Sequence, residues 1–151
     1  MSSSAQIRTA ILTVLQGVSG IGLVYERQRY SKSSKTLMEF YVQGGVLQGG
    51  FISRKGFKKV SPEGHTFTVL TTWEIDLFRA FQESGDSELA FDAVIDSIDE
   101  AFIADQTLGG VVAATVTEEQ AGIRLLTSQP AMFAGVLVHY AKLSLITEHD
   151  E

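Results

Sequence analysis

The sequence contains no cysteine and only two prolines in 151 residues. The absence of cysteine excludes disulfides, thiolate nucleophiles and cysteine-bound zinc. No stretch approaches the roughly 18 apolar residues that a membrane-spanning helix needs. The first residues lack the basic and apolar regions of a signal peptide. We therefore expect a soluble protein, made in a cytoplasm, with no membrane partner and with a single domain over residues 1–151.

Recognisable catalytic and cofactor motifs are also missing. The three histidines, His65, His139 and His149, are far apart and lack the clustered spacing of a metal site. The chain has neither a G-x-S-x-G elbow nor the G-x-x-x-x-G-K run of a phosphate-binding loop. We expect no enzymatic activity, no cofactor and no bound metal. A deep pocket lined by His139 or Asp76 would instead favour a small ligand-binding or hydrolytic domain, and this alternative remains open.

Apolar spacing predicts two long amphipathic helices. The first covers residues 4–16 and begins with a capping box formed by Ser3 and Gln6. The second begins at Asp86 or Ser87 and ends before Leu108. A short helix is predicted near 33–42 and a flexible glycine-rich loop at 42–50. Gln129-Pro130 is predicted to interrupt the extended structure. Extended segments are predicted at 21–27, 51–60, 65–75, 111–116, 124–128 and 133–147.

The strand predicted at 65–75 alternates clearly between two faces. Its predicted buried face contains Phe67, Val69, Thr71, Trp73 and Ile75. With residues 51–60 it forms an antiparallel hairpin. Since most links between strands are short, the predicted fold class is α+β. It consists of a mainly antiparallel sheet packed by two amphipathic helices, with a short third helix and a Gly-rich loop.

Charge is divided between the two halves of the chain. Residues 1–75 have nine basic and four acidic residues, whereas residues 76–151 have three basic and fourteen acidic ones. The first half contains a basic cluster of Arg54, Lys55, Lys58 and Lys59, with Phe57 among them. The cluster is compatible with a solvated hairpin edge, a protein contact or nucleic-acid binding.

The second half contains an acidic stripe on the helix after Asp86, formed by Asp92, Asp96 and Asp99 with Glu100. The stripe is compatible with a solvated face, a subunit interface or a site for a hard cation. A basic and an acidic surface on identical subunits attract head-to-tail, and such a contact forms a ring when it closes.

Four short segments follow the first amphipathic helix in a particular order. They are Val24-Tyr25-Glu26-Arg27-Gln28-Arg29-Tyr30, Gly50-Phe51-Ile52-Ser53-Arg54-Lys55, Leu108-Gly109-Gly110, and Met132 to Leu143. In this order and spacing they resemble the tail terminator (tail completion) proteins of long-tailed bacteriophages. The resemblance spans nearly the whole chain. Ala134, where a second glycine is expected, and Phe51, where tryptophan is commoner, depart from the pattern.

The resemblance implies a structural virion protein that forms a six-fold ring. The ring would cap the phage tail tube, end its growth and join it to the head connector or stopper protein. DNA would pass through the lumen without sequence-specific binding. We expect the subunit interface to pair Arg54, Lys55, Lys58 and Lys59 with Asp92, Asp96 and Asp99, and Phe57 to add apolar area. Another head–tail joining protein of the neck is the nearest alternative.

Overall fold

The computed structural model describes residues 3–29, 33–43, 45–61, 64, 66–82 and 85–151. Within these ranges the chain forms three helices and six strands. The helices are α1 (Ser4–Gln16), α2 (Ser34–Glu39) and α3 (Ser87–Ala104). The strands are β1 (Leu23–Tyr25), β2 (Val42–Gln43), β3 (Val46–Val60), β4 (Thr68–Ala80), β5 (Ile123–Phe133) and β6 (Val136–Asp150). The predicted α+β class is confirmed.

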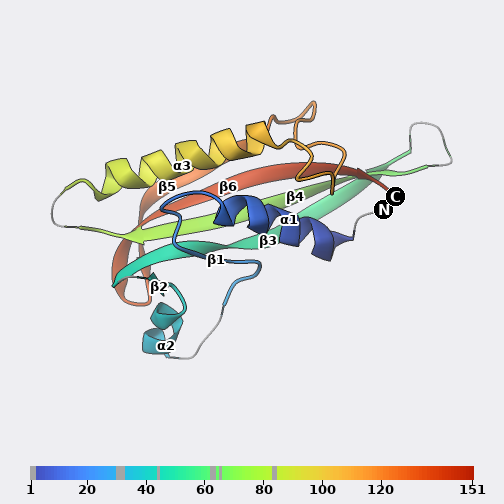
Figure 1. Cartoon of the computed structure of the whole chain (residues 1–151). Helices are drawn as coiled ribbons and strands as arrows, with labels where there is room; N and C mark the ends of the chain where they lie inside the picture. The colour runs from blue at the N-terminus through green and yellow to red at the C-terminus, as the bar shows by residue number, and fades with distance from the viewer. Residues whose placement is uncertain (1–2, 30–32, 44, 62–63, 65, 83–84) are drawn as a thin grey trace.

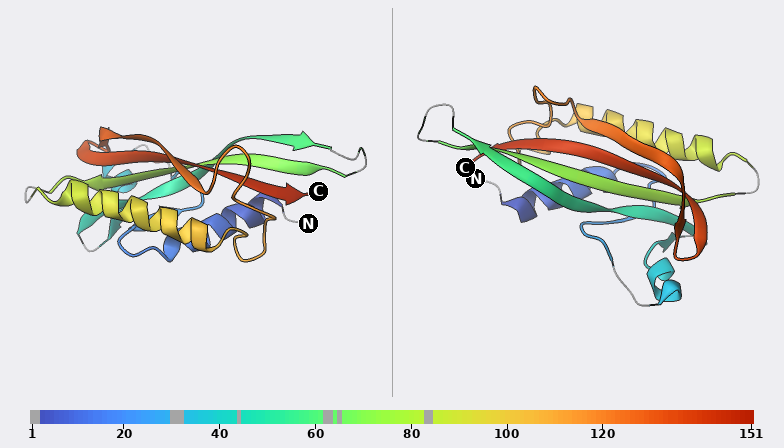
Figure 2. Two further views of the ribbon diagram at one scale, coloured as in Figure 1. Left: turned by 90° about the horizontal axis from the view of Figure 1, so that it is seen from above. Right: turned by 180° about the vertical axis from the view of Figure 1, so that it is seen from behind.

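A single twisted sheet has the strand order β1-β3-β4-β6-β5, and β2 pairs with β3 beside this path. All pairings are antiparallel except β1 with β3. Helices α1 and α3 cover the same face of the sheet, as Figure 1 shows. The view from behind in Figure 2 shows the opposite face, which is largely uncovered apart from α2 at one end. We call these the helix face and the open face.

Helix α1 forms as its sequence predicts. The Ser3 side chain accepts from the Gln6 backbone, and the Gln6 side chain accepts from the Ser3 backbone. These two bonds satisfy amide groups that a helix start leaves without partners. Ile7, Ile11 and Leu15 are fully buried on the sheet side. The capping box and the apolar stripe therefore fix both the start and the orientation of α1.

The main core lies between the two long helices and the sheet. Helix α3 contributes Phe91, Val94, Ile95, Ile98 and Phe102 to it, and each such burial stabilises the fold by roughly 1.5–3 kcal/mol. In β4, Trp73 is fully buried, and its Nε1 donates to Thr147 Oγ1 at 3.0 Å. This bond satisfies the one polar atom of the indole at the centre of the core.

A second apolar cluster lies on the open face, beneath α2. Tyr41 is fully buried and meets Tyr25, Phe78 and Phe133 edge-to-face, with ring centroids 4.8–5.4 Å apart. Phe78 and Phe133 stack at 4.2 Å. The Tyr25 hydroxyl donates to the Phe40 carbonyl. These contacts hold α2 and β2 against the sheet, and the sequence analysis did not anticipate them.

The predicted glycine-rich loop at 42–50 is wrong. Residues Val42–Gln43 form β2, and β3 begins at Val46. Gly49 and Gly50 lie inside β3, where an added Cβ would stand 2.1 Å from the carbonyl oxygens of Leu23 and Asp76, respectively. These glycines allow neighbouring strands to approach closely, and they do not form a turn.

Three further predictions in the C-terminal half are corrected, and the start of one strand in the first half lies outside the described residues. Segment 111–116 contains turns and isolated bridges in place of a strand. Strand β5 continues through Pro130 because it is an edge strand of the sheet, where a missing backbone donor is tolerated. Residue 133 belongs to β5, and β6 begins only at Val136. The expected strand start at His65 lies outside the described residues.

Gly50→Ala is expected to destabilise the protein, because the new methyl group overlaps the Asp76 carbonyl. Overpacking of this kind costs roughly 1–3 kcal/mol, or several degrees of melting temperature for a chain of this size. Gly56→Ala is the matched control, since Gly56 is in the same strand and an added Cβ there meets nothing within 4 Å. Equal melting temperatures for the two variants, measured by circular dichroism, would contradict the close-approach explanation.

Candidate subunit interface

The end of the β3–β4 hairpin is the most conspicuous uncovered part of the molecule. Strands β3 and β4 continue beyond both long helices in Figure 1. We define the hairpin end as residues 54–60 and 67–71, and it contains the whole basic cluster. Three large apolar side chains on it are exposed: Phe57 by 57%, Phe67 by 46% and Val60 by 39%. The prediction that Phe67 shares the buried face is therefore wrong.

The basic residues of the hairpin end have weak partners within the chain. Lys58 Nζ lies 2.7 Å from Glu119 Oε1, and Lys59 Nζ lies 3.0 Å from Glu151 Oε2. Lys55 Nζ is 3.8 Å from Glu74 Oε1. The Arg54 guanidinium lies over the Phe57 ring, 5.6 Å from its centroid. Exposed ion pairs contribute only about 0–1 kcal/mol each, so these lysines can exchange partners at low cost.

The predicted acidic stripe lies on the solvent side of α3. Asp92, Asp96 and Asp99 are all exposed there. Leu89, 69% exposed, and Ile103, 42% exposed, lie on the same helix. Within one chain, no ion pair between described residues joins these aspartates to the basic cluster. The two surfaces are thus separate on the subunit and available to contact different neighbours.

The open face contains a polar network that the sequence analysis did not find. The Tyr140 hydroxyl donates to Asp76 Oδ2 at 2.8 Å. Beside them, Glu74 Oε1 lies 3.4 Å from Lys142 Nζ. Burial raises the pKa of Asp76, an effect opposed by its bond to Tyr140. Burial also raises the pKa of Tyr140, and its bond to Asp76 adds to this shift. A single sequence does not show which residues of neighbouring strands lie opposite one another, so the network could not be predicted.

Asp76→Asn is expected to raise the melting temperature at pH 7. Burial raises the pKa of Asp76 from 3.8 in the folded state. Between the unfolded and folded pKa values the native state binds more protons, so its stability falls as the pH rises above about 4. The asparagine side chain has no charge, and its amide oxygen still accepts a hydrogen bond from the Tyr140 hydroxyl. Melting curves from pH 3 to 8 test this: the variant's advantage should vanish below pH 4, and parallel profiles would refute it.

A buried serine–histidine pair lies at the start of α3. Ser87 Oγ lies 2.8 Å from His139 Nε2 and also accepts from the Gln82 amide at 3.2 Å. His139 packs against Phe81, with ring centroids 3.7 Å apart. The hydroxyl belongs to a residue that is only 2% exposed. A nucleophile must reach its substrate, so this burial favours a structural role for the pair.

Ser87→Ala is expected to destabilise the protein by about 1–3 kcal/mol, because it leaves His139 Nε2 and the Gln82 amide without their partner. Ser97→Ala, at an exposed position of the same helix, is the matched control. Urea unfolding of both variants measures the difference. A structural role is contradicted if Ser87→Ala unfolds at the same urea concentration as Ser97→Ala.

The described part of the chain contains no candidate metal site. No three His, Asp or Glu side chains among these residues come together as a metal site requires. No helix in the same ranges has both the length and the apolar character needed to cross a membrane.

Neither the comparison with protein-family models nor the search of curated proteins finds a match to the chain.

Proposed function

We propose that this chain is an architectural subunit that assembles with copies of itself into a closed ring. The observation that carries the proposal is the hairpin end, where exposed Phe57, Phe67 and Val60 accompany Lys58 and Lys59. Exposed aromatic side chains leave apolar area in water, and aromatic residues are enriched in protein interfaces. An acidic, partly apolar surface on α3 of the same subunit has the complementary charge.

The contact between these surfaces is head-to-tail. A hairpin end and a helix are different surfaces, so each subunit uses one surface toward each of two neighbours. Heterologous contacts of this kind generate a ring if the rotation closes. The charges mainly determine register and encounter rate, and burial of the apolar side chains supplies most of the affinity.

The sequence resemblance extends the proposal to a specific role. The ring is proposed to be a phage tail terminator. It would be a six-fold assembly that caps the tail tube and meets the head connector. A net charge of −6 disfavours tight binding to DNA phosphates, which suits passage of DNA through a lumen. A neck protein with another position in the assembly is the alternative. The order of addition during virion assembly distinguishes the two roles.

Reversing two charges with Lys58→Glu and Lys59→Glu is expected to weaken self-association about tenfold, since each exposed contact contributes up to about 1 kcal/mol. The effect should shrink in high salt because of screening. Lys35→Glu with Arg124→Glu changes the net charge equally at exposed positions outside the hairpin end. Light scattering measures the mass of each variant, and an equal loss in both pairs would contradict a local contact.

Electron microscopy tests the role itself. The purified chain, alone or added to tail tubes, should form rings of uniform diameter. Tails assembled without the chain should have uncontrolled length, because their growth is not ended. Tails of normal length in its absence would exclude the terminator role, and a lack of rings both in solution and on tubes would exclude ring formation.

A further inference from the structure

A groove lies on the helix face, next to α1. Its volume is about 710 Å³, and it runs between α1 and residues 105–111, which follow α3. The lining is mostly small and apolar: Ala5, Ala10, Val14, Leu108 and Val111 are among its residues. This size lies within the roughly 300–1,000 Å³ range of pockets that enclose substantial ligands.

The side of α1 that lines the groove has no charge. Arg8 is the one charged residue in the helix. It points toward the sheet, where Nη1 donates to the carbonyls of Glu26 at 2.7 Å and Ile52 at 3.2 Å. The exposed positions along the groove are Ala5, Thr9 and Thr13 among others. An exposed helix face without charge is atypical of a solvated surface and typical of the centre of a protein contact.

The far wall of the groove is negative. Asp105, the C-cap of α3, lines it and is the one acidic residue of the lining. The last turn of α3 contains no basic residue to offset the negative end of the helix dipole. Gly109 donates its amide to Asp105 Oδ1 at 2.9 Å, which fixes this carboxylate at the rim. The groove thus combines an apolar floor with an acidic wall.

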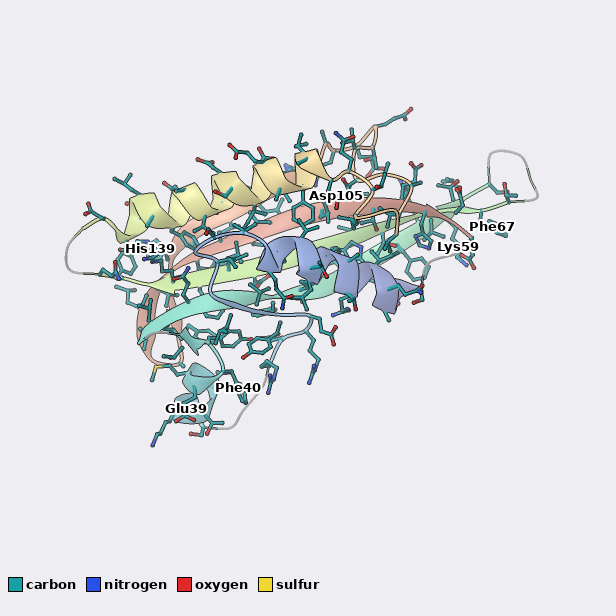
Figure 3. The ribbon with its side chains drawn as sticks, in the orientation of Figure 1. Glu39, Phe40, Lys59, Phe67, Asp105 and His139 are labelled. Carbon is teal, nitrogen blue, oxygen red and sulfur yellow. The ribbon has the colours of Figure 1, made fainter. Side chains whose placement is uncertain are left out.

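We infer that this groove receives the hairpin end of a second copy of the chain. The occupant must present apolar side chains flanked by cations, and the hairpin end has Phe57, Val60 and Phe67 beside Lys58 and Lys59. Lys59 and Phe67 already lie together, with Nζ 5.9 Å from the ring centroid. In Figure 3, they project from the body while Asp105 lies at the end of α3. This inference rests on the proposed ring.

The groove also changes which acids meet the lysines. Asp92 and Asp105 are thirteen residues apart, or about 20 Å along a helix axis. A hairpin end seated in the groove meets Asp105, which lines it, and leaves Asp92 near the opposite end of α3. Lys58 or Lys59 then exchanges Glu119 or Glu151 of its own chain for this carboxylate. The apolar contacts determine where the hairpin end sits in the groove, and the charges determine its orientation there.

Disulfide trapping tests the inference cleanly because the chain has no cysteine of its own. Thr9→Cys places a thiol in the groove, Val60→Cys places one on the hairpin end, and Ser97→Cys places one on the exposed middle of α3. Each variant is mixed with Val60→Cys protein that carries a size tag, under mild oxidation. The expected product is a tagged–untagged disulfide between positions 9 and 60, at least fivefold more abundant than that between 97 and 60.

The outcomes separate this inference from the proposed function. A preference for position 97, on protein that light scattering shows to assemble, overturns the groove and leaves ring formation intact. Failure of every variant to link, with no assembly in solution or on tail tubes, overturns both. The protein with both Thr9→Cys and Val60→Cys should give a ladder beyond the dimer, and a product limited to dimers would overturn the head-to-tail arrangement.

A substitution that fills the groove provides a second test. Thr9→Trp blocks the floor, whereas Gln16→Trp adds the same side chain at an exposed position of α1 outside the groove. Self-association should weaken at least tenfold for Thr9→Trp and change less than twofold for Gln16→Trp, with both melting temperatures unchanged. Equal association constants for the two variants would count against the groove as the receiving site.

Discussion

The difference in length between the strands and the helices that cover them governs the shape of this molecule. Strand β3 has 15 residues and α3 has 18. At about 3.4 Å per strand residue and 1.5 Å per helix residue, these elements extend roughly 50 Å and 27 Å. Helices of this length cannot cover the whole sheet. The β3–β4 pairing therefore continues past the core, and its far end lacks a helix to bury its apolar side chains.

This constraint also explains the limits of prediction from sequence. The alternation of residues 65–75 correctly identified the buried side of β4, because Trp73 and Ile75 are fully buried. It failed for Phe67, since a period of two reveals which face a residue occupies but not whether a helix lies above it. Helix α1 was predictable from its capping box and apolar stripe, and α3 from its apolar stripe, because these are local signals. The groove could not be predicted in this way, because it lies between α1 and residues about 100 positions away in the sequence.

The glycines illustrate a different limit. Gly49 and Gly50 were interpreted as turn residues because glycine is the usual residue of turns. In the structure each is needed because carbonyl oxygens of neighbouring strands occupy the space of a side chain. Close approach of this kind leaves no periodic signature in a single sequence. The aromatic cluster around Tyr41 was missed for a similar reason, since its four rings come from four separate segments of the chain. Long-range packing thus decides what local patterns leave open.

The proposed contact is modest for a single pair of subunits, and ring geometry compensates for this. Each exposed ion pair in such a contact contributes only about 0–1 kcal/mol. In a closed ring every subunit is held by two such contacts, and the last contact forms between partners that are already linked. The effective concentration for this step is far above that in solution. Weak individual contacts with exchangeable lysine partners therefore favour assembly on a template that aligns the subunits, such as the end of a tube, over assembly in free solution.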